Sequence, residues 1–411
     1  MKKANILLAI MVFAIVGVIS TPDESSAVPS FSRQTGNPCW ACHFQHIPKL
    51  NAMGRNFKLN GFTDASSDLA EDENLSIPAP WFPISFISKV QFVKSSPKVS
   101  GNPESGAERG QWKIPDEAAF SVAGRAAENI GYSLEMDGSK WNNAKIMMPF
   151  LKGDYTAGLV IHTTDGHGPA TGFEMLNNGL LRGQRGFEDR KGAYAAQAVL
   201  ARGYNGRSSG LGLFGGNDLV QVYASLWAPA WGVDQTLDTG LEMSQYARVT
   251  VTPELSDSMS LGFGVAYYGG ESVCVKCAGD PPEGESAVEH TFATDALVVD
   301  AQLQAEFDNG MSLEASLSYA SAGDKGNPDQ LFIDSEATSG AIMVGITPQL
   351  NLQAAYSAYT NNESGADINT IVTGVWYSLF QNIEAVVEYS VYDGDGASDD
   401  NILKVMLFSA F

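Results

Sequence analysis

Between residues 84 and 411, apolar residues alternate with small or polar residues, and the pattern has a period of two. Such a period places successive side chains on opposite faces of the chain, as in a β-strand with one apolar and one polar face. Turn-forming residues separate the alternating segments. We predict about sixteen strands, at 84–94, 118–127, 130–137, 142–150, 155–163, 193–202, 218–228, 241–252, 258–269, 293–307, 311–321, 338–346, 350–359, 368–378, 382–392 and 402–411.

The connections between these strands also alternate in length. Short turns at 128–129, 152–154, 308–310, 347–349 and 380–381 take turns with long loops rich in Gly, Asn and Asp. An even number of strands with short turns at one end and long loops at the other is typical of a bacterial outer-membrane barrel, whose termini lie on the periplasmic side. A soluble sandwich of two sheets is the alternative, but closure into a barrel removes the edges that so many strands would expose.

Residues 1–27 have the pattern of a secretory signal peptide. Lys2 and Lys3 precede an uncharged apolar run over 6–19, and Ser25-x-Ala27 provides small residues for cleavage. The run of about 14 residues is shorter than the roughly 20 that a membrane-spanning helix needs. We therefore expect an exported chain in which residues 84–411 form an all-β, porin-like barrel in the outer membrane.

Residues 28–63 lack the period of two and form a separate unit. Pro48 and Gly61 bound a short predicted helix whose apolar residues lie three and four positions apart. One or two helices are too small to bury a core without a further apolar filling. An acidic linker, rich in Pro and Ser, follows over 64–83.

The N-terminal unit contains the pattern Cys39-x-x-Cys42-His43. At this spacing two thiols add across the vinyl groups of one haem, and the following His ligates the iron. The alternatives are a redox dithiol, a structural disulfide or half of a zinc site. No second Cys pair lies nearby in the sequence to complete a zinc site, and export brings the chain to the compartment where c-type haem is attached. We predict one covalent c-type haem, bonded to Cys39 and Cys42 and ligated by His43.

The sequence leaves the second axial ligand of the iron open. Met53 is a weak candidate that would fold over from the predicted helix and raise the reduction potential, with plain helix packing as its alternative. His46 follows His43 by three residues and is expected on the same side of the ring, which makes it a poor candidate. The other three His residues are expected at surface or lumen positions: His162, His167 and His290.

A second pair of thiols, Cys274-x-x-Cys277, is followed by Ala278 instead of His, so we predict no second haem. The pair falls in a long loop of an exported chain. Cysteines in an oxidising compartment favour a disulfide, which would pin this loop. A metal or redox site is the alternative.

The chain of 411 residues has a formal net charge of −22. This charge disfavours nucleic acid as a partner, because phosphates need Lys and Arg. Acidic residues gather in the last four long loops, where they either solvate an exposed face or concentrate cations such as Fe²⁺ at a negative mouth. The long loop 164–192 is charge-balanced and is the third outer loop, which in porins often folds inward to narrow the channel.

The chain resembles the fused cytochrome–porin family of outer-membrane Fe(II) oxidases in the block Pro29-Ser30-Phe31-Ser32-Arg33-Gln34-Thr35-Gly36, the haem motif through Phe44-Gln45, and Pro48-x-Leu50-Asn51-x-x-Gly54-Arg55-x-Phe57-Lys58. In that family a monohaem c-type cytochrome is joined to a sixteen-stranded porin. By this resemblance, Cys39, Cys42 and His43 hold the haem. It also implies an Fe(II):cytochrome c oxidoreductase in outer-membrane lipid, with the haem unit on the periplasmic side or in the lumen.

In such a protein extracellular Fe(II) gives an electron by outer-sphere transfer, and a periplasmic c-type cytochrome or another soluble acceptor collects it. Three other functions stay open at this point. One is a conduit for a different extracellular donor or acceptor. The second is a diffusion porin whose haem is structural, and the third is a soluble cytochrome joined to a β-domain.

Overall fold

The computed structural model of the chain describes residues 30–47, 49–65, 83–96, 110–137, 140–164, 186–203, 207–230, 242–274, 290–323, 329–380, 382–397 and 400–411. The predicted signal peptide, most of the predicted linker, His167 and Cys277 lie outside these residues. Among the described helices, none has the length and apolarity that a membrane-crossing helix requires.

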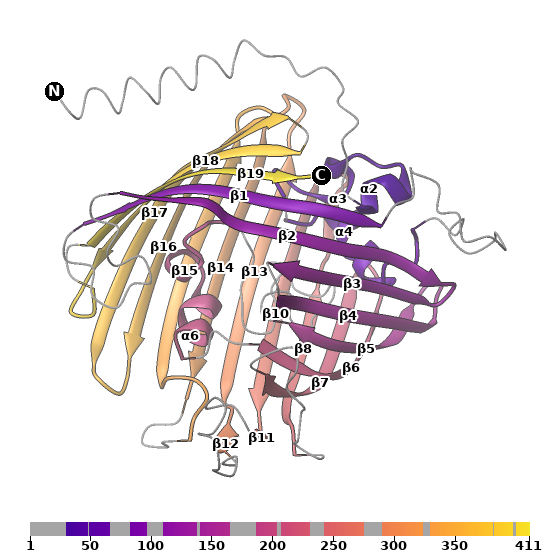
Figure 1. Cartoon of the computed structure of the whole chain (residues 1–411), viewed down its shortest axis with the longest axis horizontal. Coiled ribbons are helices and arrows are strands. Elements are labelled where there is room, and N and C mark those ends of the chain that lie inside the picture. Colours follow the sequence, from indigo (N-terminus) through magenta and orange to yellow (C-terminus); the bar gives the residue numbers. More distant parts are fainter. Residues whose placement is uncertain are drawn as a thin grey trace.

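The described strands close into an antiparallel barrel (Figure 1). The 17-stranded sheet has sixteen positions around the barrel, because the short strand β9 continues β8 along β10. The strands are β1 (Ile84–Ser95), β2 (Gln111–Ala127), β3 (Ile130–Asp137), β4 (Lys140–Leu151), β5 (Thr156–Thr164), β6 (Arg207–Gly216), β7 (Val220–Ala230), β8 (Ser244–Val251), β9 (Glu254–Ser256), β10 (Met259–Gly269), β13 (Ala296–Glu306), β14 (Ser312–Ala322), β15 (Ser335–Gly345), β16 (Leu350–Asn361), β17 (Ala366–Phe380), β18 (Ile383–Asp393) and β19 (Asp400–Ala410).

The first and last of these strands complete the closure. β1 pairs antiparallel with β19 from Ile87↔Ala410 to Ser95↔Ile402, and β1 also pairs with β2. The sheet therefore closes on itself, as full closure into a barrel requires. A separate hairpin of β11 (Glu271–Cys274) and β12 (His290–Ala293) lies outside this sheet.

In a soluble sandwich the apolar face of a strand is buried and the polar face is exposed. In this barrel the polar residues of the strands are buried and the apolar residues are exposed. On β8, Ser244, Arg248 and Thr250 are buried, while on β10 Phe263 and Val265 expose 51% and 47% of their surface. Polar side chains thus face the lumen and apolar side chains face outward, the arrangement of a barrel in lipid. The all-β, sixteen-stranded prediction is confirmed.

The two ends of the barrel differ. Short connections at 128–129, 152–155, 307–311, 346–349 and 381–382 lie at one end, which we call the short-turn end. The other end, which we call the long-loop end, carries the long connections, together with the short ones that join β3 to β4 and β16 to β17. The C-terminus and the first helices lie at the short-turn end (Figure 1).

One predicted strand is wrong. Residues 193–202 belong largely to the helix α6 (Ala195–Gly203), and the strand at this place in the barrel is β6, which the sequence reading treated as loop. On β6, Gly210 and Gly212 alternate with the outward Leu211. A Cβ on Gly210 would lie 2.1 Å from the carbonyl oxygen of Leu226, so this close pairing requires glycine.

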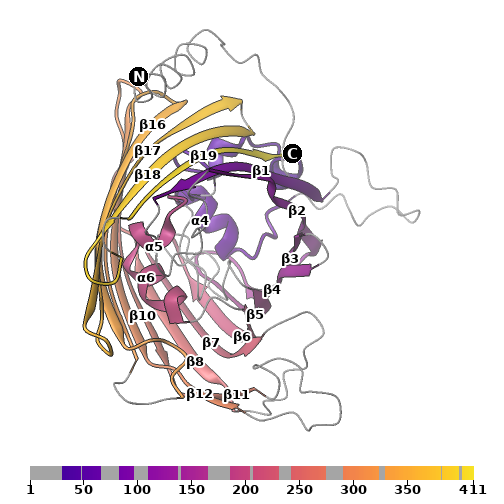
Figure 2. The ribbon, with the colours of Figure 1, turned by 60° about the vertical axis from the view of Figure 1, so that its left-hand side comes forward.

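Helix α6 lies inside the barrel (Figure 2), within an inserted segment, residues 186–203, that covers the end of the loop 164–192 and the segment predicted as a strand. This inserted segment begins with the short helix α5 (Arg190–Ala193). The backbone N–H groups of Glu188 and Asp189 donate to the carboxylate of Glu388 on β18, at 2.9 and 2.7 Å. The backbone N–H of Ala195 donates to hydroxyl oxygens of the wall strands β14 and β15.

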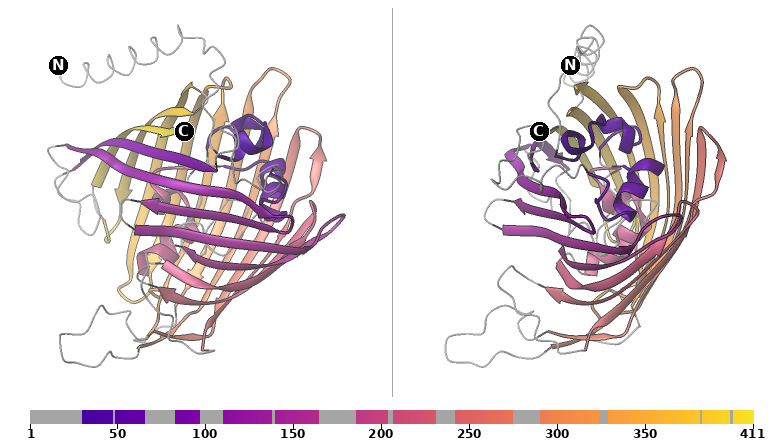
Figure 3. Two further views of the ribbon diagram at one scale, coloured as in Figure 1. Left: turned by 45° about the vertical axis from the view of Figure 1, so that its right-hand side comes forward. Right: turned by 90° about the vertical axis from the view of Figure 1, so that its right-hand side faces the viewer.

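The N-terminal unit, residues 30–65, occupies the lumen near the short-turn end (Figure 3). It contains α2 (Ser30–Thr35), α3 (Cys39–Cys42) and α4 (Ala52–Leu59). Phe31 packs between Phe57 and Phe62, with ring centroids 5.0 and 5.1 Å apart, which joins α2 to α4.

Candidate functional site

The haem motif forms a single helical turn. Pro38, with φ −68° and ψ 160°, precedes α3, and the backbone N–H of His43 donates to the carbonyl oxygen of Cys39. Cys39 and Cys42 are therefore three positions apart on one turn, where side chains lie on the same face. No disulfide joins these two cysteines, and each is partly exposed.

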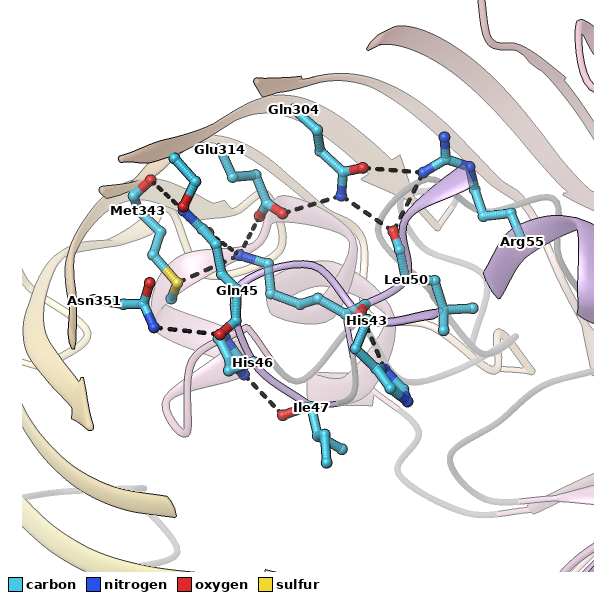
Figure 4. A network of polar contacts seen from close by, with 12 residues as sticks. His43, Gln45, His46, Ile47, Leu50, Arg55, Gln304, Glu314, Met343 and Asn351 are labelled. Atoms are coloured by element: carbon cyan, nitrogen blue, oxygen red, sulfur yellow. Dashed lines mark hydrogen bonds and ion pairs between the residues drawn. The ribbon is translucent and has the colours of Figure 1, made fainter. Parts of the chain in front are cut away.

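The ring of His43 is held by the loop that follows α3. His43 pairs with Leu50 in an antiparallel bridge, and its Nδ1 lies 3.1 Å from the carbonyl oxygen of Lys49. A hydrogen bond at Nδ1 selects the tautomer with the lone pair on Nε2, which is a common arrangement for a metal-ligating His. The ring points away from Glu314 and Gln304 of the barrel wall (Figure 4).

Helix α4 is fastened to the haem motif by two residues. The side-chain oxygen of Asn51 accepts from the backbone N–H of Gly54 at 3.0 Å, while its Nδ2 donates to the carbonyl oxygen of Ala41 at 2.9 Å. Asn51 thus hydrogen-bonds a free carbonyl oxygen at the end of α3 and a free backbone N–H at the start of α4. At Gly54, a Cβ would lie 2.2 Å from the carbonyl oxygen of Cys42, so the close approach of the two helices needs glycine.

The loop between these helices is bound to the barrel wall by a buried polar network (Figure 4). The Lys49 ammonium lies 2.8 Å from the carboxylate of Glu314 on β14. Gln304 on β13 donates to the carbonyl oxygen of Leu50 at 3.1 Å, and Arg55 donates to the same oxygen and to Gln304, both at 3.2 Å. These contacts place the loop that holds His43 against two adjacent strands.

A second set of contacts reaches strands farther around the barrel. The ring of His46 stacks on Trp376 of β17, with centroids 3.9 Å apart, and His46 is buried. The backbone N–H of Ile47 donates to Glu384 of β18 at 3.2 Å, and Asn351 of β16 donates to the carbonyl oxygen of Gln45 at 3.3 Å. His46 therefore packs against the wall of the barrel.

The electrostatics of the network follow from its burial. Desolvation lowers the pKa of Lys49, and the nearby Glu314 carboxylate opposes this shift. Desolvation likewise lowers the pKa of Arg55, to about 10, so the guanidinium keeps its charge near neutral pH. Two cations of the N-terminal unit thus meet an acidic side chain of the lumen wall.

The residues of the motif fit a c-type haem. Two thiols on one turn and a His with its Nδ1 bonded to a carbonyl are the donors that such a group requires. Trp40 and Met53 add large apolar side chains that expose 64% and 48% of their surface beside the motif, where a porphyrin would cover apolar area. Met53 on α4 remains the candidate for the second axial position.

Two other histidines considered from the sequence, His162 and His290, lie away from the haem motif. His162 of β5 is buried in the lumen wall, 3.3 Å from the hydroxyl of Ser225. His290 of β12 stands opposite Cys274 of β11 in the hairpin outside the main sheet. The side chain of Cys274 and all of Cys277 lie outside the described residues, so the predicted disulfide stays a prediction.

The sequence reading missed the groups that hold the unit in the barrel, above all Lys49, Arg55, Gln304 and Glu314. A signal for them was present. Glu314 occupies an inward position of its strand, and a charge there calls for an opposite charge inside the lumen. For Glu314, the N-terminal unit supplies this charge through Lys49.

Neither the comparison with family models nor that with curated proteins gives a match. Among solved structures, the chain is similar to OprB of Pseudomonas putida, with 11% identity over 80% of this chain and 94% of that one and a TM-score of 0.54. It is also similar to the outer membrane channel DcaP of Acinetobacter baumannii, with 14% identity over 80% and 96% of the two chains and a TM-score of 0.45.

A third similar structure is an anion-selective porin from Comamonas acidovorans, with 9% identity over 80% of this chain and 98% of that one and a TM-score of 0.46. At these identities the similarity defines the fold. The chain is a porin-like outer-membrane barrel. Within its lumen it carries a helical unit with a Cys-x-x-Cys-His turn.

Proposed function

We propose that this barrel is a porin-enclosed c-type cytochrome that takes electrons from extracellular Fe(II) and passes them to a soluble periplasmic acceptor. One observation carries the proposal. The Cys39-x-x-Cys42-His43 turn lies inside a porin-fold lumen, with His43 oriented through its Nδ1. The block of residues around the turn resembles that of fused cytochrome–porin Fe(II) oxidases, and this resemblance supports iron as the donor.

The residues of the unit have distinct roles in this proposal. The thiols of Cys39 and Cys42 would hold the porphyrin through thioether bonds, and His43 Nε2 would ligate the iron. A haem held in this way supplies one-electron chemistry without bond-making at the substrate. The carbonyl oxygen of Lys49 holds the His43 ring, and Gly54 lets α4 pack against the haem turn.

The orientation follows from the rule that outer-membrane barrels place short turns in the periplasm and long loops outside. In this orientation the N-terminal unit and the C-terminus face the periplasm. The acidic long loops face the exterior, where they raise the local concentration of Fe²⁺. Because Fe³⁺ precipitates near neutral pH, transfer of the electron alone leaves the oxidised product outside.

A diffusion porin with a structural haem is the second candidate, and the similarity to channel proteins favours it. Apolar side chains that fill part of the lumen argue against an open diffusion channel. One apolar cluster contains Leu59 and Phe62 of the N-terminal unit, Val199 of the inserted segment, and Met147 and Val160 of the wall. This cluster fills lumen that an open channel would leave to water.

The proposal is tested on the full chain purified from the outer membrane. We expect a haem stain that survives denaturing electrophoresis and is lost in the Cys39→Ser, Cys42→Ser double variant. We also expect the reduced-haem absorbance band to grow when Fe²⁺ is added under anoxic conditions. Growth with dithionite but not with Fe²⁺ would contradict iron as the donor. High single-channel conductance that survives His43→Ala would favour the diffusion porin.

A further inference from the structure

A two-residue bridge links the predicted axial ligand to the barrel wall. The carbonyl oxygen of Lys49 bonds His43 Nδ1, and Leu50 is the bridge partner of His43. Two other groups of this dipeptide, the Lys49 ammonium and the Leu50 carbonyl oxygen, are bound by residues of the barrel wall. The Lys49 ammonium pairs with Glu314, and Gln304 donates to the Leu50 carbonyl oxygen, so each residue of the bridge contacts both His43 and the barrel.

The two wall residues form a pre-arranged site. Gln304 and Glu314 are direct register partners across β13 and β14, and their side chains are joined at 3.4 Å between Gln304 Nε2 and Glu314 Oε2. The side chains of Lys49 and Glu314 expose only 1% and 6% of their surface. A buried charge without its partner is costly, so the ammonium has one strongly preferred position along the wall. The anchored Lys49 side chain limits where its own backbone can lie, and the Lys49 carbonyl oxygen also accepts from the backbone N–H of Phe44 at 2.9 Å.

We infer that Glu314 and Gln304 are positioning residues for the axial ligand: through Lys49 and Leu50 they set the orientation of the His43 ring. The inference rests on the proposed function, because it takes His43 as the iron ligand. The group that bonds the second ring nitrogen of a ligating His controls the tautomer, the orientation and the basicity of that ligand. The barrel wall therefore acts on the iron through the peptide chain, without touching it.

The test compares Glu314→Gln and Lys49→Met in the full haem-containing chain. The readouts are the EPR signal of the ferric haem, which reports ligand geometry, and its midpoint potential. Each single variant removes the buried pair, so we expect both to change the EPR signal in the same way, from one species to a mixture. The double swap of Lys49→Glu with Glu314→Lys restores the pair and is expected to restore the single species.

A purely electrostatic influence gives a different result. Loss of the carboxylate raises the midpoint potential and loss of the ammonium lowers it, because a nearby positive charge favours the reduced iron. Opposite shifts of the potential with an unchanged EPR signal in both single variants would overturn the positioning role.

The matched control is Asp300→Asn. It breaks another buried ion pair of the lumen, in which Arg248 and Asp300 approach to 2.7 Å and expose 2% and 0% of their side chains. We expect its EPR signal to equal that of the unchanged protein. A change as large as that of Glu314→Gln would show that any buried pair in the barrel has this effect, and would overturn the inference.

A milder variant guards against loss of folding. Gln304→Met keeps the Lys49–Glu314 pair and removes the Gln304 hydrogen bonds to Leu50, Arg55 and Glu314. Arg55 still donates to the Leu50 carbonyl oxygen, so we expect a smaller EPR change in the same direction. Heat-modifiable migration identifies the folded barrel for each variant, and if Glu314→Gln fails to fold, Gln304→Met decides. Absence of covalent haem from the unchanged protein overturns the proposed function. An unchanged EPR signal in folded, haem-containing Gln304→Met and Glu314→Gln overturns only this inference.

Discussion

Two inserts occupy the lumen, and different interactions hold them. The N-terminal unit shares apolar contacts with the wall through Leu59 and Phe62, and it is also bound by directional polar contacts, among them the buried Lys49–Glu314 ion pair. The helix α6 is held mainly by apolar packing: Val199 and Leu200 lie in one cluster with Tyr223 and Trp227 of β7. Apolar burial is not directional, whereas a buried ion pair tolerates little displacement.

The difference shows what each insert contributes. Apolar packing occupies space, and α6 narrows the lumen without needing one exact side-chain geometry. Polar contacts select one position among several of similar packing, which a redox centre needs if its ligands are to keep a fixed arrangement. Four variants test this division, and they follow in order of decreasing expected effect.

The largest effect is expected for Lys49→Met. The variant leaves Glu314 buried without its partner, which costs about 3–5 kcal/mol of the free energy that keeps the N-terminal unit docked. Limited proteolysis of the unit over a urea series measures this loss. The control is Lys152→Met, which removes a more exposed contact between the unit and the wall, 3.7 Å from Asp64. We expect at most about 1 kcal/mol there; equal effects would contradict the importance of burial.

Leu200→Ala removes apolar packing from α6. Leu200 exposes 3% of its surface, and the cavity is expected to cost about 2–4 kcal/mol. Because packing of α6 narrows the lumen, we also expect single-channel conductance to rise. Leu211→Ala is the matched control, since Leu211 faces outward and is 52% exposed. If the two variants conduct alike, α6 does not restrict the lumen.

Gly54→Ala tests the contact inside the N-terminal unit. Its Cβ would meet the carbonyl oxygen of Cys42 at 2.2 Å, so α4 must shift, at a cost of about 1–3 kcal/mol. The urea midpoint for protease cleavage within the unit should fall. Met53→Ala, at the neighbouring 48% exposed position, is expected to change that midpoint less. The reverse order would show that α4 does not depend on this close approach.

The smallest effect is expected for Asn51→Ala, which removes the cap of α4 and costs about 1 kcal/mol. The same protease assay measures it. Asn51→Ser keeps an oxygen that accepts from Gly54 but loses the donor to the Ala41 carbonyl. We expect an intermediate midpoint for this variant, and no difference between Ser and Ala would mean that the cap itself is unimportant.

The strands could be predicted largely from the sequence because their outward faces contact lipid. That requirement imposes the same alternation on every strand, so the segment predicted at 382–392 is observed at Ile383–Asp393. The prediction failed for helix α6, which lies in the lumen and has no side in contact with lipid. Residues 195–201 of α6 are all buried, and the helix packs against β14, β15 and β16, so no exposed polar face marks it, although its Ala, Leu, Gln and Arg are strong helix formers.

The candidate site likewise has one part that could be predicted from the sequence and another that could not. The spacing of Cys39, Cys42 and His43 is local chemistry and could be read directly from the chain. The partners of the unit could not, because Gln304 and Glu314 come together only through strand register. No local pattern tells which inward residue of a sixteen-stranded wall meets Lys49 or Leu50.

The long chain separations in these contacts impose an order of events in biogenesis. Gln45, at the start of the chain, bonds Ser312, 267 positions later, and Ile47 bonds Glu384, 337 positions later. The unit leaves the export machinery well before its binding site exists. In the proposed cytochrome, haem would therefore reach the Cys39–His43 turn while that turn is still outside any barrel, and membrane insertion of the wall would then enclose a unit that is already loaded.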